Sequence, residues 1–325
     1  MFYKEKMNIF AFLVLSFFSF QGIEAQEQEA VLDLSKADLF ATSGLSLETG
    51  WEFYYNQLLE PNAYFSPLKS EIVPFSSLWK DLGKSNIGYA TYRLKVILPD
   101  EYPLLSLYIP DFYTSYKLFA NGIPIAENGT VAKTKAEYVP MYDPKVVYLS
   151  NLNGEKELEL VLQVANFLPY RGGISRPIFI GSAHEMQHHM DLSNGLILIL
   201  AGAAFVCGLF FISLFFFNNV DSSSVYYGIF CLLCALYILV RGEYLLLNFF
   251  PELPWQIVTR LEHFTFFTAT IFFLMFVKCL FGKEFNSKVL KVSLGISIFF
   301  SIISIFTPVY FYTLLTPGFL IFLMV

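Results

Sequence analysis

The chain has 325 residues, of which 55% are hydrophobic and only 15% are charged. Average soluble domains carry about 25% charged residues, so this composition excludes an ordinary soluble enzyme and indicates a membrane protein. The net charge of −6 leaves no basic excess with which to hold nucleic acid. Residues 26–190 hold 13 basic and 19 acidic side chains, whereas residues 191–325 hold 6 of each. We therefore expect a polar half followed by an apolar half.

The first 25 residues have the three parts of a secretory signal. Lys4 and Lys6 precede the apolar run Ile9–Phe20, and Ile23–Ala25 ends in a small residue suited to cleavage. This run is shorter than the ~20 residues that a spanning helix needs, although an uncleaved anchor is the alternative. The pattern predicts a signal peptide over residues 1–25 and export of the chain that follows.

Residues 26–183 predict an all-β domain. Gly88–Leu98 and Glu157–Asn166 alternate apolar and polar residues, as a half-buried strand does. Asn121-Gly122 lies between two apolar stretches and predicts a tight hairpin. Further short strands are expected at 104–109 and 145–149. Short strands with turn residues between them predict a β-sandwich or jelly roll.

Residues 192–325 predict an α-helical membrane bundle. Five apolar stretches are long enough to cross or begin to cross a bilayer. They are Leu192–Phe217, Val225–Leu247, Ile257–Leu280, Val289–Thr307 and an incomplete fifth, Phe311–Val325. Backbone polar groups at this depth must be satisfied within the segment, so we expect helices.

Lysines around one connection predict the orientation of the bundle. Lys278, Lys283, Lys288 and Lys291 lie in and beside the connection from the third stretch to the fourth. The positive-inside bias places this connection in the cytoplasm and the β domain on the other side of the membrane. The export signal agrees. We therefore expect a multi-pass protein of a bacterial inner membrane with a periplasmic or extracellular N-terminal domain.

An ordered set of short motifs resembles a known receptor family. The set comprises Trp51–Pro61 (WEFYYNQLLEP), Gly88–Arg93 (GYATYR), Asn121-Gly122, Asn128-Gly129, Asn166, Arg171–Gly173 and Pro177–Gly181. Followed by several spans, it is similar to bacterial seven-transmembrane receptors with diverse intracellular signalling modules. The resemblance covers nearly the whole chain after the signal.

The resemblance implies an outer jelly roll that binds a small, carbohydrate-like ligand, then seven spans and a cytoplasmic output module such as a histidine kinase or a cyclase. About five spans are present, and no kinase, cyclase or DNA-binding motif occurs in the sequence. We therefore expect no catalysis and no cofactor in this chain, which is either a fragment of such a receptor or a receptor whose output module is on another protein. Its expected partners are the small ligand, membrane lipid, and either a second copy or a cytoplasmic signalling protein.

Several residues of the β domain have the chemistry of a sugar site. Such sites combine aromatic faces for stacking with planar polar groups that bond hydroxyls. The candidates are Trp51, Tyr54, Tyr89, Arg93, Asn166, Tyr170 and Arg171. A core role is the alternative, above all for Trp51. Arg93 is the most informative candidate, because the alternation projects it from the face opposite the apolar one.

Four charged residues flank the predicted second outer loop: Arg241, Glu243, Arg260 and Glu262. Charges at membrane depth are functional by default, but long side chains near helix ends also reach the interface. In the resembled family an Arg-containing helix end precedes Gly-Glu and a Pro-Trp loop, which Arg241–Glu243 and Pro254-Trp255 fit. Tyr237 departs from the pattern, where another basic residue is expected. We predict a polar cluster that couples sensor to bundle, with interfacial anchoring as the alternative.

His184–His188 (HEMQH) matches the HExxH zinc motif, in which two histidines bind zinc and the glutamate activates water. A catalytic zinc needs a third ligand, and the next downstream glutamate, Glu243, lies beyond a whole span. The motif also falls in the short joint 184–191, which leaves no room for a substrate cleft. Asp191 could join His184 and His188 in adventitious metal binding or a pH response. A polar juxtamembrane helix is favoured. A zinc metallopeptidase, and a transporter or its accessory subunit, are the alternatives.

Overall fold

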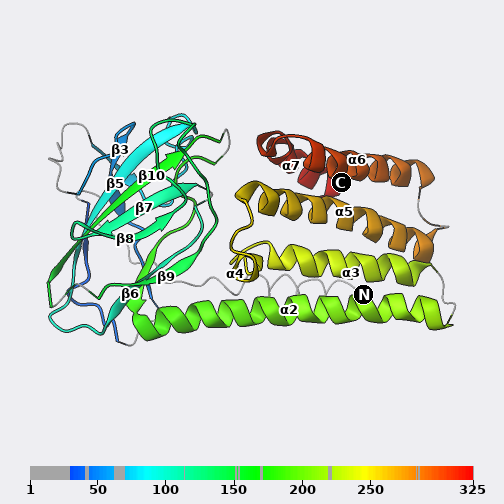
Figure 1. Ribbon diagram of the computed structural model, residues 1–325, viewed down its shortest axis with the longest axis horizontal. Coiled ribbons are helices and arrows are strands. Elements are labelled where there is room, and N and C mark those ends of the chain that lie inside the picture. Colours follow the sequence, from blue (N-terminus) through cyan, green and yellow to red (C-terminus); the bar gives the residue numbers. More distant parts are fainter. Residues whose placement is uncertain are drawn as a thin grey trace, which may run out of the picture.

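The structure is a computed structural model. It describes residues 30–324 apart from 41–43, 62–69, 113, 151, 153, 169–170, 219–221, 283 and 285. The signal peptide predicted over residues 1–25 lies outside the described residues. A β domain comes first, and a bundle of helices extends away from it (Figure 1).

Two sheets form the described part of the β domain. The larger has, in spatial order, β4 (Glu71–Pro74), β3 (Gly50–Tyr55), β5 (Gly88–Ile97), β10 (Glu157–Asn166), β7 (Ser115–Ala120) and β8 (Ile123–Asn128), with β1 (Val31–Asp33) beside β5. The smaller has β2 (Leu45–Ser46), β11 (Phe179–Ser182), β6 (Leu105–Ile109) and β9 (Lys145–Tyr148). Pairing among these named strands is antiparallel except for β1 with β5.

The strand predictions are confirmed. The two alternating stretches are the paired central strands β5 and β10. Asn121 and Gly122 form the turn between β7 and β8, and both have positive φ, 46° and 81°. Asparagine and glycine tolerate this left-handed backbone better than other residues do, which is why this dipeptide closes the hairpin.

Aromatic side chains dominate the core between the sheets. Trp51 stacks on Phe75 with ring centroids 4.2 Å apart. The Trp79 indole donates a hydrogen bond to the Tyr92 hydroxyl at 2.8 Å, so these two buried polar groups satisfy each other. Burying each such side chain contributes roughly 1.5–3 kcal/mol. The core therefore needs no disulfide, and its side chains fix the relative position of the two sheets.

The helices lie side by side (Figure 1). They are α2 (Ala183–Asn218), α3 (Ser223–Leu239), α4 (Leu246–Phe249), α5 (Trp255–Phe281), α6 (Ser287–Phe306) and α7 (Val309–Met324). Among the described residues, α2, α5 and α6 are long and apolar enough to cross a membrane, and α3 and α7 are shorter apolar helices. α5, with Lys278 in its last turn, ends at the end of the bundle away from the β domain, and α6 begins there (Figure 1). The predicted orientation in the membrane stays a prediction.

One predicted span needs correction. The stretch Val225–Leu247 is not a single helix, because α3 ends at Leu239 and a turn over 240–245 precedes α4. Gly242 and Tyr244 in this turn have φ of 79° and 51°, a left-handed backbone through which an α-helix does not continue. The chain thus reverses close to the β domain, and Arg241 lies in a turn instead of a helix.

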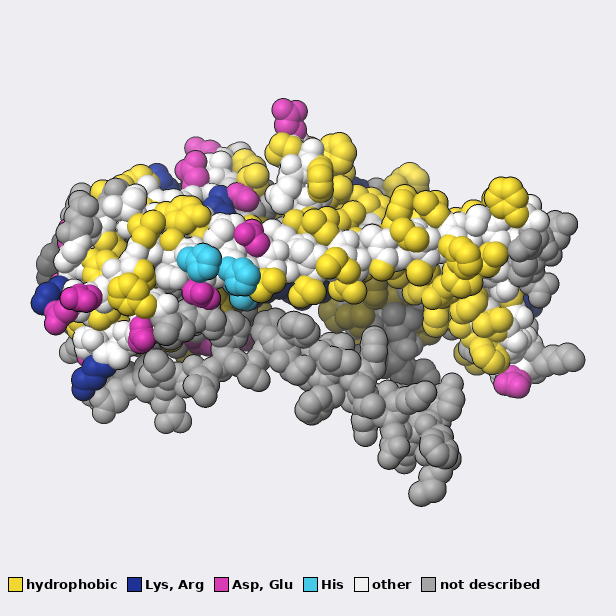
Figure 2. Space-filling model, turned by 90° about the horizontal axis from the view of Figure 1, so that it is seen from below, with side chains coloured by type: hydrophobic (Ala, Val, Ile, Leu, Met, Phe, Trp, Pro, Cys, Tyr) yellow, Lys and Arg dark blue, Asp and Glu magenta, His cyan; other side chains and the backbone are white. Residues whose placement is uncertain are grey.

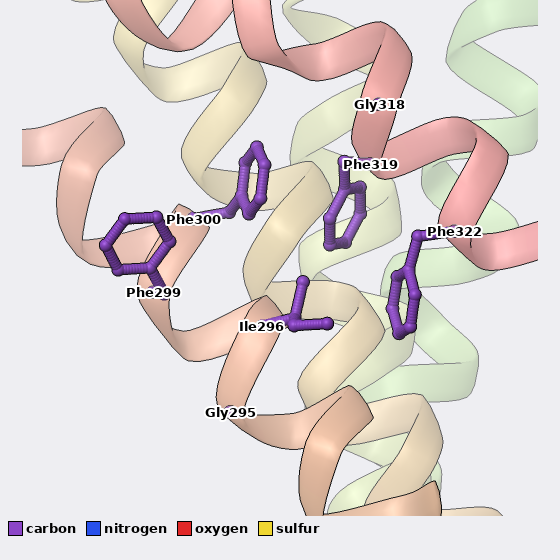
Figure 3. A pocket seen from close by; sticks show the side chains of 7 residues that line it. All are labelled: Gly295, Ile296, Phe299, Phe300, Gly318, Phe319 and Phe322. Atoms are coloured by element: carbon purple, nitrogen blue, oxygen red, sulfur yellow. The ribbon is translucent and has the colours of Figure 1, made fainter.

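The outer surface of the bundle is apolar. Figure 2 shows hydrophobic side chains along the helices, whereas charged side chains gather mainly over the β domain. Ile199 on α2 is 68% exposed, which is costly in water and favourable against acyl chains. A hollow of about 480 Å³ between α6 and α7 has the same character, as its lining side chains contain only carbon (Figure 3). It therefore suits acyl chains or another apolar helix, not a polar ligand.

Candidate functional site

The β domain continues into the bundle without a linker. β11 ends at Ser182 and α2 begins at the next residue, where the Ser182 hydroxyl accepts a hydrogen bond from the Glu185 amide at 3.2 Å and caps the helix. Met186 is buried against two glycines of the β domain. A Cβ on Gly44 would lie 2.4 Å from the Met186 methyl carbon, and one on Gly181 would lie 3.0 Å from it. This close packing makes the joint rigid.

The histidines of the joint face outward. His184 and His188 are exposed, with nearly parallel rings whose centroids are 6.2 Å apart. Figure 2 shows histidines together on the surface near the β domain. Asp191 accepts a hydrogen bond from the side-chain amide of Gln187 at 2.9 Å. In the part of the chain that the structure describes, no group of three or more His, Cys, Asp or Glu is placed to hold a metal ion. Metal binding by His184 and His188 stays the less favoured alternative to a polar helix, because these two histidines alone would supply only two ligands.

A second contact joins the β domain to the turn over 240–245. The hydroxyl of Tyr108, on β6, donates a hydrogen bond to Glu243 at 2.9 Å. Burial, and then the Glu243 charge, raise the pKa of Tyr108, so this phenol stays protonated as a donor. Tyr142 stacks on Tyr244 with ring centroids 4.3 Å apart and lies against Trp255. Two aromatic side chains of the β domain, Tyr108 and Tyr142, therefore contact the end of the bundle nearest that domain.

Three of the four predicted coupling residues lie at this contact. Arg241 forms an ion pair with Glu262 at 3.2 Å, and it also hydrogen-bonds the Tyr237 hydroxyl. The charges of Glu262 and Glu243 both help to raise the pKa of Asp111 in the β domain. Tyr237, where the resemblance would put a cation, thus serves as a partner of Arg241.

Arg260 lies apart from the other three. Its guanidinium donates to the carbonyl of Ile305 near the end of α6, where helix carbonyls lack partners within the helix. It lines a hollow of about 390 Å³ together with Trp255 and Tyr310. Its geometry is that of a helix cap, and its part in coupling stays a prediction.

Sequence reasoning missed Asp111, which lies after β6 and is only 1% exposed. Neither of its carboxylate oxygens has a hydrogen-bond partner among the described residues. Burial is the main cause that raises the pKa of Asp111 to about 7, with Arg176 opposing the shift and Glu262 and Glu243 adding to it. An acid in the sequence Ile109-Pro-Asp-Phe112, directly after a fully buried strand, was the signal that could have revealed it.

Arg93 projects from the outer face of the large sheet, as predicted. It bridges Glu52 on β3 and Glu159 on β10, with nitrogen–oxygen distances of 3.3 Å and 2.6 Å. Partial burial lowers the pKa of Arg93, but the hydrogen bond to Glu159 and the nearby carboxylates outweigh it and raise that pKa. The Tyr54 hydroxyl donates to Glu52 at 2.9 Å, and burial together with Glu52 raises the pKa of Tyr54 to about 12. Tyr54 and Arg93 are thus joined through Glu52.

The other ligand candidates lie elsewhere. Trp51 is fully buried, and its indole donates to the Leu47 carbonyl at 3.0 Å. Asn166 is also fully buried, and its amide nitrogen donates to the carbonyls of Asn86 and Leu168. These contacts are structural. Tyr89 is half-buried, Arg171 is exposed with φ of 52°, and Tyr170 lies outside the described residues. Ligand binding by all seven stays a prediction.

Comparison with known proteins identifies the membrane half. Residues 193–325 match the family described as 7TM diverse intracellular signalling. This half of the chain is a 7TM diverse intracellular signalling domain. The resemblance drawn from the sequence is thereby confirmed, and the protein is a multi-pass membrane protein with an N-terminal β domain. No curated protein sequence matches the chain.

Solved structures similar to the chain are sugar hydrolases. A Bacteroides uniformis β-glucuronidase has 15% identity and a TM-score of 0.34, over 42% of this chain and 17% of that one. A GH2 β-galacturonidase from Eisenbergiella tayi bound to galacturonate has 17% identity and a TM-score of 0.30, over 43% and 24%. The chain thus spans under a quarter of either enzyme, and likeness this weak carries no argument about what it binds.

Proposed function

We propose that the chain is a receptor of a bacterial inner membrane. Its β domain faces the periplasm or cell exterior and binds a small, carbohydrate-like ligand. The bundle relays that binding toward a cytoplasmic output module. The observation that carries the proposal is the double attachment of the β domain, through the Met186 joint on α2 and through the Tyr108–Glu243 contact on the turn.

The two attachments start from neighbouring strands. β6 carries Tyr108, and its paired neighbour β11 leads directly into α2; Tyr108 and Phe179 are opposite each other in this pairing. A shift of β6 against β11 would therefore move the turn over 240–245 against α2. A ligand that binds one arrangement of the β domain better than another would bias the bundle by that difference in affinity.

The outer face of the large sheet favours a neutral, hydroxylated ligand. Arg93 contributes one positive charge there, and Glu52 and Glu159 contribute two negative charges. The face consequently has no cationic surplus for an anionic ligand. Its guanidinium and carboxylates are planar groups that can donate to and accept from adjacent hydroxyls, as sugar recognition requires.

Binding of neutral mono- and disaccharides to the full chain in lipid nanodiscs tests the ligand class. We expect at least one sugar to raise the thermal midpoint, and Arg93→Gln to weaken its binding about tenfold or more, equivalent to ~1.4 kcal/mol. Lys95→Gln is the matched control, because Lys95 lies on the same strand and pairs with the exposed Glu157. Equal binding by Arg93→Gln and the unchanged chain, or no sugar binding, would contradict the assignment.

A further inference from the structure

Asp111 lies where the β domain meets the bundle, near Glu243 and Glu262. Both carboxylate oxygens are buried without a hydrogen-bond partner among the described residues. A buried carboxylate normally has such partners, because an isolated charge in a medium of low polarity is expensive. The neutral, protonated carboxyl is much less costly in this position.

The groups that face Asp111 come from both halves of the molecule. Arg171 and Arg176 precede β11 and attract a negative charge at Asp111, whereas Glu243 of the turn and Glu262 of α5 repel it. The remaining groups are two phenols and two charged side chains that interact with neighbours of Asp111. They are Tyr108 on β6, Tyr116 on β7, Asp143, which acts on Tyr116, and Arg241, which pairs with Glu262.

The two carboxylates that repel Asp111 belong to the bundle. Separation of the β domain from the bundle would therefore relieve the repulsion and let water reach all three carboxyl groups. The nearby arginines belong to the β domain and would stay with Asp111. Ionised Asp111 thus favours separation, and neutral Asp111 favours contact.

We propose that Asp111 is a proton-binding site that makes the attachment of the β domain to the bundle depend on the pH outside the cytoplasm. The bound proton keeps the β domain seated, and its loss loosens the contact. This inference deepens the proposed function and rests on it, because it assumes that the two halves act as coupled parts. It adds the proton as a second ligand.

The direction of the effect follows from the raised pKa. Asp111 has a pKa of about 7 when seated and would return toward its ordinary value of 3.8 when hydrated. The seated state is therefore favoured most below the ordinary value and loses this advantage as the pH rises through about 7. Between these values the ratio of loosened to seated molecules rises by up to about tenfold per pH unit.

Tryptophan fluorescence of the full chain in nanodiscs tests the proposal without any sugar. Trp255 lies in the contact beside Tyr142, and the other two tryptophans, Trp51 and Trp79, lie in the β core, so a Trp255→Phe variant isolates its signal. We expect a transition centred near pH 7, the value at which Asp111 loses its proton. Asp111→Asn, a neutral variant of equal size, should stay at the acid level throughout.

Two further variants make the test decisive. Arg176→Gln removes a charge that lowers the pKa of Asp111, so it should move the midpoint to higher pH. Asp100→Asn is the control, since Asp100 is an exposed acid paired with Lys156. A transition that persists in Asp111→Asn, or a midpoint that Arg176→Gln leaves in place or lowers, would overturn the proposal. If Asp111→Asn does not fold, Arg176→Gln alone decides. Failure of sugar binding would overturn the ligand class and leave this result standing.

Discussion

The Tyr108 hydroxyl of the β domain donates a hydrogen bond to the Glu243 carboxylate of the bundle. We expect Tyr108→Phe to lower the free energy of unfolding by about 1–2 kcal/mol, because the hydrogen bond from Tyr108 to the Glu243 carboxylate is lost. Denaturant unfolding of the full chain in mixed micelles measures this. Tyr102→Phe is the control, because the Tyr102 hydroxyl donates to the exposed Glu155 carbonyl. An equal loss in both variants would remove the special role of Tyr108.

At this scale the sequence predicts side-chain chemistry better than side-chain partners. The outward direction of Arg93 followed from strand alternation alone. The charged neighbours of Asp111 did not, because Arg176 is far from it in the sequence and Glu262 approaches it only where the β domain meets the bundle. The HExxH motif shows the same limit: its buried residue is Met186, whose neighbours are Gly44, just before β2, and Gly181 on β11.

At the scale of elements, α2 and α3 cross at a pair of glycines. A Cβ on Gly208 would lie 2.9 Å from the Gly228 carbonyl oxygen, and one on Gly228 would lie 2.8 Å from that of Gly208. We expect Gly208→Ala to destabilise the bundle by about 1–3 kcal/mol, since the helices must move apart. Unfolding in sodium dodecyl sulfate measures the change.

Gly202 on the same helix is the matched control for that substitution. Nothing lies within 4 Å of a Cβ built there. Gly202→Ala should therefore be neutral or stabilise the helix by up to about 1 kcal/mol, the helix preference of alanine over glycine. If the two substitutions have the same effect, the close crossing is not what holds α2 against α3.

Element boundaries were predictable where backbone chemistry and hydropathy agree. β5 and β10 are regular strands with period-two alternation, and Asn121-Gly122 marks their neighbouring hairpin. The end of α3 was not predictable from hydropathy, because residues 240–247 remain largely apolar while the backbone turns. Gly242 was the local signal there, and the aromatic contact of Tyr244 with Tyr142 helps hold the turn.

At the scale of the whole molecule, composition already separates the polar β domain from the apolar membrane half. The mutual orientation of the halves depends on a few contacts, and no sequence pattern specifies it. In the proposed receptor, two attachments from adjacent strands would convert a rearrangement within the β domain into a displacement of α2 against the turn over 240–245. The proposed function therefore requires the two halves to be energetically coupled.

Hydrogen exchange of the full chain in nanodiscs, with and without a saturating sugar that binds the β domain, measures this coupling. We expect the sugar to change amide protection in β3, β5 and β10 and also at Val240–Leu245, because coupling is reciprocal between the two sites. Tyr108→Phe should reduce the change at Val240–Leu245 while it leaves the change in the strands. Protection that changes in the strands alone would contradict the coupling.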